Sequence, residues 1–174
     1  FSPKGDYLLS TNSDGEFAKL WEINTGKIIR TYSLPNQESL GPFVNGAFYK
    51  VQFLPEGKQF ISVGKDGDKD SIFIWDVATG QKIHQIPLES PMVALSVDGR
   101  SFVSPNNTQL TLKDIKTTQT LHSLNRADSQ RITSLALHPK AQQVVTGHSD
   151  GRLIVWDFLS GKKQCTLNAH KQSI

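Results

Sequence analysis

The feature that most constrains this chain is an internal repeat. Four ten-residue segments align without gaps. Each begins with a large apolar residue, turns in its middle, places apolar residues at its eighth and ninth positions and ends in Ser or Thr. They are "FSPKGDYLLS" (1–10), "FLPEGKQFIS" (53–62), "LSVDGRSFVS" (95–104) and "LHPKAQQVVT" (137–146). The last three start 42 residues apart and the first step is 52, so the chain is expected to repeat one supersecondary unit.

A second block follows each of these segments, and its pattern also predicts a strand. The four blocks are "FAKLWEINTG" (17–26), "SIFIWDVATG" (71–80), "TLKDIKTT" (111–118) and "LIVWDFLSG" (153–161). They alternate with a period of two, are rich in β-branched and aromatic residues and meet Gly, Asn or Asp at their boundaries, all of which favour strands. Almost nothing in the sequence has a helical pattern, and the predicted class is all-β.

At these residues the chain resembles the WD-repeat β-propeller family, because the period, the turn glycine and the Trp-Asp dipeptide coincide. The resemblance implies a four-stranded antiparallel blade for each repeat, with Trp75-Asp76 and Trp156-Asp157 closing the third strand. Trp21-Glu22 is a near match. The third repeat departs from the pattern, with Lys113-Asp114 at the dipeptide and Thr118 where the other repeats have Gly. We expect that blade to be looser, since a lysine cannot fill the volume of an indole.

The resemblance also implies a hydrogen-bonded set that braces each blade: Trp on the third strand, Ser or Thr on the second, Asp in the turn between them, and His in the loop before the first strand. The matching residues are Ser10, Asp14 and Trp21 in the first blade and Thr146, Asp150 and Trp156 in the fourth, and Ser62, Trp75, Asp76 and Asp157 are further structural residues that the resemblance implies. For the histidine, only His170 follows the expected pattern, and it precedes a further blade. The loop before the fourth blade has Asp128 nearest that place, so the fourth brace is expected to be incomplete.

The repeats divide the chain at approximately 1–34, 35–90, 91–131 and 132–174, within one partial propeller over 1–174. Ile174 falls where Ile132 stands in the previous repeat, so both ends are expected to cut a blade. Propellers close with typically four to eight blades, and closure removes exposed strand edges. The predicted architecture is an open arc of a larger ring, completed by further blades of the same chain, and a closed four-blade ring is the alternative.

Composition argues against several classes of function. The chain has 174 residues with 19 basic and 16 acidic side chains and a net charge of +3, too nearly balanced to indicate nucleic-acid binding. No apolar run approaches the roughly 20 residues that span a bilayer. The single cysteine, Cys165, cannot form an internal disulfide and permits a reducing compartment. We predict a cytoplasmic protein with no cofactor, no nucleic-acid partner and no membrane association.

The stretch "KDGDKDSIFIWD" (65–76) sets three aspartates in the alternating spacing of a calcium loop. When Asp66 is counted as the first position of such a loop, the sixth position is Ser71 rather than Gly. The twelfth is Val77, where calcium loops carry a bidentate Glu. The same stretch occupies the turn that every repeat has between its second and third strands. The sequence therefore favours an acidic turn widened by a few residues over a calcium site.

No catalytic constellation emerges from the sequence. His148, Ser149 and Asp150 have the side chains of a catalytic triad, but adjacent residues at a tight turn cannot converge as nucleophile, base and orienter. They are better interpreted as the end of a second strand and its turn. Two classes of function remain: a non-catalytic scaffold that binds proteins or peptides, and a sensor or specificity propeller domain of a larger multidomain enzyme or signalling protein.

The second repeat holds the predicted binding surface. Its loop before the first strand is lengthened at 35–47 and its turn between the second and third strands is lengthened at 66–71. Both emerge on one face, because the strands of a blade alternate in direction. Phe43 is either an exposed aromatic anchor beside an acidic rim, matched to a basic or amphipathic peptide, or part of a small satellite core. The predicted partner-binding residues are Phe43, Asn45, Tyr49, Asp66, Asp68, Lys69 and Asp70.

Overall fold

The computed structural model describes residues 1–11, 17–34, 48–66, 69–106, 108–126, 130–138 and 142–171. They belong to two compact units, Phe1–Pro91 and Met92–Ile174. Within the described ranges every regular element is a β-strand. None of these residues belongs to a helix long and apolar enough to cross a bilayer.

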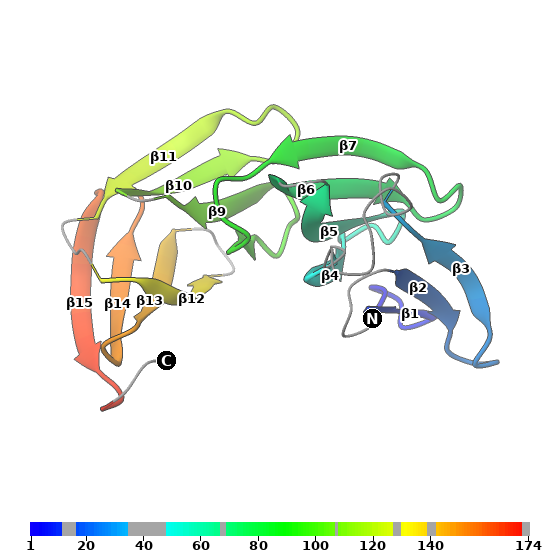
Figure 1. Ribbon diagram of the computed structural model, residues 1–174, viewed down its shortest axis with the longest axis horizontal. Helices are drawn as coiled ribbons and strands as arrows, with labels where there is room; N and C mark the ends of the chain where they lie inside the picture. Colours follow the sequence, from blue (N-terminus) through cyan, green and yellow to red (C-terminus); the bar gives the residue numbers. More distant parts are fainter. Residues whose placement is uncertain are drawn as a thin grey trace. The chain divides into compact units, whose positions relative to one another are not determined.

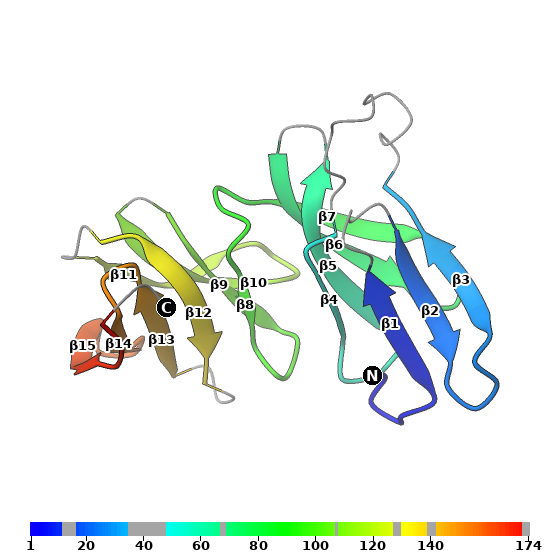
Figure 2. The ribbon, with the colours of Figure 1, turned by 60° about the horizontal axis from the view of Figure 1, so that its bottom comes forward.

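The first unit contains two antiparallel sheets whose strands follow one another in chain order (Figures 1 and 2). Sheet 1 has three strands in the described part of the chain: β1 (Tyr7–Thr11), β2 (Ala18–Glu22) and β3 (Ile28–Tyr32). Sheet 2 comprises β4 (Lys50–Phe53), β5 (Gln59–Asp66), β6 (Lys69–Asp76) and β7 (Lys82–Pro87).

The second unit repeats the arrangement with two four-stranded sheets. Sheet 3 comprises β8 (Ala94–Leu95), β9 (Ser101–Pro105), β10 (Gln109–Asp114) and β11 (Thr120–Asn125). Sheet 4 comprises β12 (Ile132–Leu137), β13 (Gln143–His148), β14 (Arg152–Asp157) and β15 (Lys162–Asn168). The predicted class, an all-β fold of antiparallel blades, is confirmed. The repeat boundaries and the open arc stay predictions.

The first unit is held together by aromatic side chains between sheet 1 and sheet 2. Tyr32 of β3 is 2% exposed, and its ring centroid lies 4.7 Å from that of Phe60 and 5.8 Å from that of Trp75. Phe60 and Trp75 face each other across the β5–β6 ladder, with ring centroids 6.0 Å apart and planes 8° apart. Such rings bury large apolar areas, so this cluster is the main stabilising contact between the two sheets.

In the second unit, aliphatic residues of sheet 3 meet the tryptophan-bearing face of sheet 4. Leu110, Leu112 and Leu124 form one core cluster with Trp156 and Phe158. Both units therefore pack in the same way. In each of them, the face of one sheet that carries the buried tryptophan packs on the apolar face of the sheet before it in sequence.

Every sheet has a register shift at the same place in its outermost hairpin. The shift lies between Leu20 and Trp21, Ile74 and Trp75, Leu112 and Lys113, and Val155 and Trp156. A β-bulge of this kind adds one residue to the outer strand and increases its local twist. Sheet 3 keeps the bulge although it lacks the tryptophan, so the bulge does not depend on the indole.

Candidate functional site

Three of the four sheets contain a tryptophan that donates a hydrogen bond to a hydroxyl on the neighbouring strand. The indole Nε1 of Trp21 lies 2.8 Å from Ser10 Oγ, that of Trp75 lies 2.9 Å from Ser62 Oγ, and that of Trp156 lies 2.9 Å from Thr146 Oγ1. The latter two pairs are buried. A buried indole N–H without an acceptor is costly, which explains why each of these neighbouring strands carries a Ser or Thr at the position that the indole reaches.

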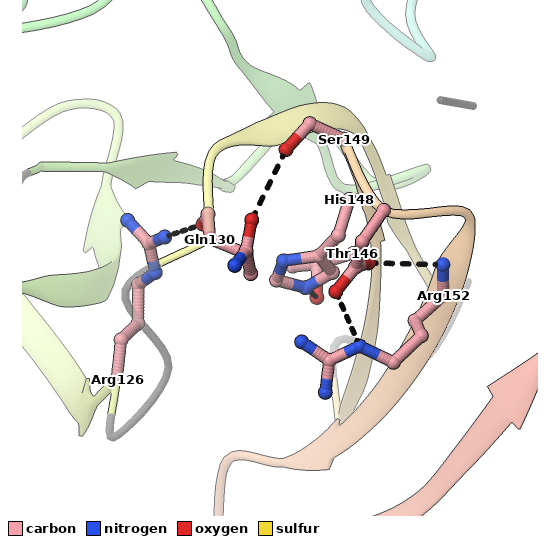
Figure 3. Close-up of polar contacts among 7 residues, drawn as sticks. Arg126, Gln130, Thr146, His148, Ser149 and Arg152 are labelled. Carbon is pink, nitrogen blue, oxygen red and sulfur yellow. Dashed lines mark hydrogen bonds and ion pairs between the residues drawn. The ribbon is translucent and has the colours of Figure 1, made fainter. Parts of the chain in front are cut away.

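The histidine beside the brace of sheet 4 is His148, which the sequence interpretation placed only at a strand end. Its ring Nε2 lies 2.8 Å from Thr146 Oγ1, and the side chain is fully buried (Figure 3). The brace therefore obtains a histidine from β13 itself. A signal for this was present in the sequence, because residues two apart on a strand point to the same face.

Two predicted structural residues lie near the turn of sheet 4: Asp150, expected in the brace of this sheet, and His170, expected before a further blade. The carboxylate of Asp150 bonds to Arg152, with Oδ2 lying 2.6 Å from Nε, and does not contact the Thr146 hydroxyl (Figure 3). His170 is exposed, and its backbone N–H donates to the carbonyl of Gly151 at 3.0 Å. Both residues lie at the end of sheet 4 where local bonds close the strand turn, and their roles in a brace stay predictions. Asp14 lies outside the described residues.

The aspartate of the Trp-Asp dipeptide organises the turn that follows it. Asp76 Oδ1 accepts hydrogen bonds from the backbone N–H of Thr79 at 2.7 Å and from its hydroxyl at 2.9 Å. Asp157 does the same with Ser160 at 2.7 and 2.9 Å. These backbone and hydroxyl donors lower the pKa of both carboxyls, because they stabilise the ionised form. The dipeptide thus couples an indole brace to a rigid turn.

Contacts from sheet 1 reach the same turn of sheet 2. The guanidinium of Arg30 donates to the carbonyl of Ala78 at 2.8 Å, and the hydroxyl of Tyr32 lies 3.3 Å from the carbonyl of Val77. Burial raises the pKa of Tyr32 to about 12, Arg30 opposes the shift, and Asp76 adds to it. The turn therefore serves as a fixed docking point between the sheets of the first unit.

The lengthened stretch of the second repeat is a longer hairpin rather than a widened turn. Strands β5 and β6 have 8 residues each, whereas the equivalent strands of sheet 4 have 6. The extension places Lys65 opposite Asp70 and Asp66 opposite Lys69 in the ladder. Opposite charges facing each other across an antiparallel pair stabilise it by roughly 0.2–1 kcal/mol. Lys69 and Asp70 therefore lie in a strand, and Asp70, one member of the expected acidic rim, stands opposite Lys65.

Tyr49 and Asp70, two of the predicted partner-binding residues, are brought together by sheet 2. Tyr49 precedes β4, its backbone N–H donates to Val63 at 2.7 Å, and its side chain is 48% exposed. Burial of part of the phenol, the Asp70 charge and a hydrogen bond to the Asp70 carboxylate raise the pKa of Tyr49. The structure thus presents a half-exposed aromatic ring whose hydroxyl is held by a carboxylate.

The other predicted partner-binding residues cannot be placed. Phe43, Asn45 and Asp68 lie outside the described residues, as does the side chain of Asp66, so the aromatic anchor stays a prediction. Among the described side chains, no group of three or more His, Cys, Asp or Glu is arranged to hold a metal ion.

Comparison with known proteins points to one family. Residues 118–157 match the family model "WD domain, G-beta repeat". The chain is similar to WD repeat-containing protein 25 of Mus musculus, with 27% identity over 99% of the chain and 33% of the relative. It is also similar to cilia- and flagella-associated protein 52 of Chlamydomonas reinhardtii, with 27% identity over 88% of the chain and 23% of the relative.

A third relative is eukaryotic translation initiation factor 3 subunit I of Nematostella vectensis, with 27% identity over 82% of the chain and 47% of the relative. The chain spans less than half the length of each of these three proteins. Taken with the repeated strand meanders, the indole braces and the Trp-Asp turns, these similarities support a WD-repeat family for the chain, whose repeat model matches residues 118–157.

Proposed function

We propose that the chain is a non-catalytic WD-repeat scaffold that binds a protein or peptide at the end of sheet 2 where Tyr49 lies. The relatives support this at the level of class, since one of them is by name a subunit of a larger factor. A cytoplasmic location is part of the proposal. It rests on the single cysteine, which is exposed and not in a disulfide, as is ordinary in a reducing compartment.

The observation that carries the proposal is the exposure of Tyr49 beside the hairpin of β5 and β6. Tyrosine supplies a rigid, amphipathic contact surface and is enriched among residues that dominate binding energy. The Asp70 carboxylate beside the phenol raises the pKa of Tyr49, and a ring with such a neighbour loses less entropy when a partner orders it. Phe43 and Asn45 extend this surface in the proposal, while Lys65 and Lys69 remove the preference for a basic ligand that an acidic rim implied.

Affinity capture with the full-length protein, followed by quantitative mass spectrometry, tests this site. Tyr49→Ala and Phe43→Ala should each reduce recovery of the same partner by about tenfold, which corresponds to loss of one central aromatic contact. Phe17→Ala provides the control, because Phe17 is a partly exposed aromatic residue of the same unit on another sheet. Undiminished recovery by both Tyr49→Ala and Phe43→Ala would exclude this end of sheet 2 as the binding surface.

The variant Asp70→Asn tests whether Asp70 acts on the phenol of Tyr49. The amide keeps an acceptor but removes the charge that helps raise the pKa of Tyr49, so this pKa should fall. Ultraviolet titration of tyrosine ionisation would measure that fall. An unchanged Tyr49 titration would show that Asp70 does not hold the phenol.

A further inference from the structure

A second surface lies at one end of sheet 4, around the turn between β13 and β14. The segments that adjoin this turn carry five basic residues: Arg126, Arg131, Arg152, His170 and Lys171. We call these five residues the basic patch. They come from the end of β11, the segment before β12, the start of β14 and the segment after β15, so only the fold gathers them.

Backbone hydrogen bonds hold these segments against the turn. The N–H of Ser149 donates to the carbonyl of Arg131 at 3.0 Å, and the N–H of His170 donates to the carbonyl of Gly151 at 3.0 Å. The side chain of Ser149 also lies 3.4 Å from Gln130 Oε1 (Figure 3). The positions of the basic residues are thus tied to the turn through the main chain.

Two of the arginines are fixed by their own side chains. The guanidinium of Arg126 donates to the carbonyls of Asn106 at 3.0 Å and Gln130 at 2.7 Å. Arg152 is held by Asp150 on the other flank of the turn. Side chains that are already ordered lose less entropy on binding. The exposed members, Arg131, His170 and Lys171, extend the positive surface into solvent.

The patch carries more positive than negative charge. Among the described residues at this turn, four members of the patch are permanently cationic, against the carboxylate of Asp150. Arginine presents a planar fork of donors that matches a carboxylate with two parallel hydrogen bonds. We propose that the basic patch binds an acidic segment of a partner protein, one that carries several Asp or Glu residues.

The patch fits a peptide better than a nucleic acid. Non-specific nucleic-acid binding typically uses several phosphate contacts along a continuous basic track. Here a carboxylate lies at the centre of the cations, on the turn itself. Such an interruption repels a phosphate backbone, whereas a peptide can place its acidic side chains on either flank.

Fluorescence anisotropy with a short synthetic peptide rich in Asp and Glu tests the proposal on the full-length protein. A counterpart with Asn and Gln at the same positions should not bind, and affinity for the acidic peptide should fall as salt rises. The double variant R131Q/K171Q should lose about tenfold in affinity, because each exposed charge contributes modestly. Both side chains are exposed and the Arg131 bond uses its carbonyl, so the melting temperature should not change.

The double variant K162Q/K163Q is the matched control. It removes the same charge from the same sheet, but Lys162 pairs with Asp157 at the far end of β14, whereas Asn168 pairs with Arg152 at the patch. This control should bind the acidic peptide like the parent protein, as should Tyr49→Ala, which lies in the other unit.

Equal losses in the two double variants would overturn the proposal, because they would show an effect of net charge alone. Absence of binding at low salt would do the same. A third outcome would also overturn the proposal. If the protein bound a DNA oligonucleotide more tightly than the acidic peptide, and R131Q/K171Q lost that DNA binding, the patch would be a nucleic-acid site. Failure of any of these tests leaves the Tyr49 surface untouched, since the two surfaces share no residue.

Discussion

The turn that follows Asp114 in sheet 3 is strained at Thr118, and relieving this strain should stabilise the protein. Thr118 has a backbone φ of 59°, and it is the only residue other than glycine with a positive φ in the described ranges. The equivalent positions carry Gly26, Gly80 and Gly161, with φ of 67, 77 and 68°. A β-branched residue is a poor occupant of the left-handed region because its Cβ crowds the backbone.

The rest of the turn keeps Thr118 in place. Asp114 Oδ1 accepts from the N–H groups of Lys116 at 2.9 Å and Thr117 at 2.7 Å, and from the Thr117 hydroxyl at 3.0 Å. The N–H of Thr118 then donates to the Asp114 carbonyl at 3.0 Å. These bonds impose the left-handed conformation on whichever residue follows Thr117.

The expected gain from Thr118→Gly is a difference of two effects. Left-handed backbone costs an ordinary residue roughly 1–2 kcal/mol, and glycine removes that cost. Glycine also has more freedom in the unfolded chain, which costs roughly 0.5–1 kcal/mol. The net expectation is a free energy of unfolding higher by about 0.5–1 kcal/mol, or a melting temperature higher by about 1–3 °C in a chain of this size.

Urea denaturation at equilibrium measures this change, and two control variants define its origin. Thr117→Gly removes the hydroxyl that bonds to Asp114 and accepts from the N–H of Gln119, and should lower the free energy of unfolding by about 1 kcal/mol. Gly161→Thr makes the reverse exchange in sheet 4, where the nearest atom to an added Cβ is 4.0 Å away, so only backbone strain should be felt. A Thr118→Gly variant as destabilised as Thr117→Gly would refute the reasoning.

Three further outcomes are expected. Gly80→Ala should cost more than Gly26→Ala in thermal melts, because an added Cβ at Gly80 would lie 2.7 Å from the Arg30 side chain, while the site at Gly26 is open. Trp75→Ala should lower the free energy of unfolding by about 3–5 kcal/mol in urea titrations, as a large cavity is left in the aromatic cluster. For Tyr32, the raised pKa means that its stabilising effect is complete below pH 10 and is lost between pH 10 and about 12. Tyr32→Phe should remove that part of the alkaline loss of stability, and equal alkaline curves for both proteins would contradict the assignment.

Much of the fold could be read from the sequence, because the relevant signals are local. Alternation of period two, turn residues and the Trp-Asp dipeptide each depend on neighbours within one hairpin. The third strands of sheets 2 and 4 accordingly end at Asp76 and Asp157 as predicted. Thr118 could also be identified from the sequence, because it stands at a position where the other three repeats have Gly.

The candidate sites depended more on the tertiary structure. The stretch 65–76 looked like an enlarged acidic loop, but strand pairing set Lys65 against Asp70 and turned it into a longer hairpin. The register of β5 and β6, that is, which residues of the two strands face each other, decides whether this stretch is a loop or a hairpin. The proximity of Tyr49 to Asp70 has the same origin, since the two residues stand on either side of β5 in one sheet.

By itself, the sequence determined the repeat, the strand class and the Ser or Thr that accepts each indole bond, because each of these follows from spacing within one repeat. Only the tertiary structure decided that Arg30 and Tyr32 of sheet 1 bond to the turn of sheet 2, and that the segments of the basic patch gather at one turn of sheet 4. The physical reason is that a side chain's partner is chosen by the packing of separate segments. Spacing along the chain records which face a residue occupies, but not what the fold brings to that face.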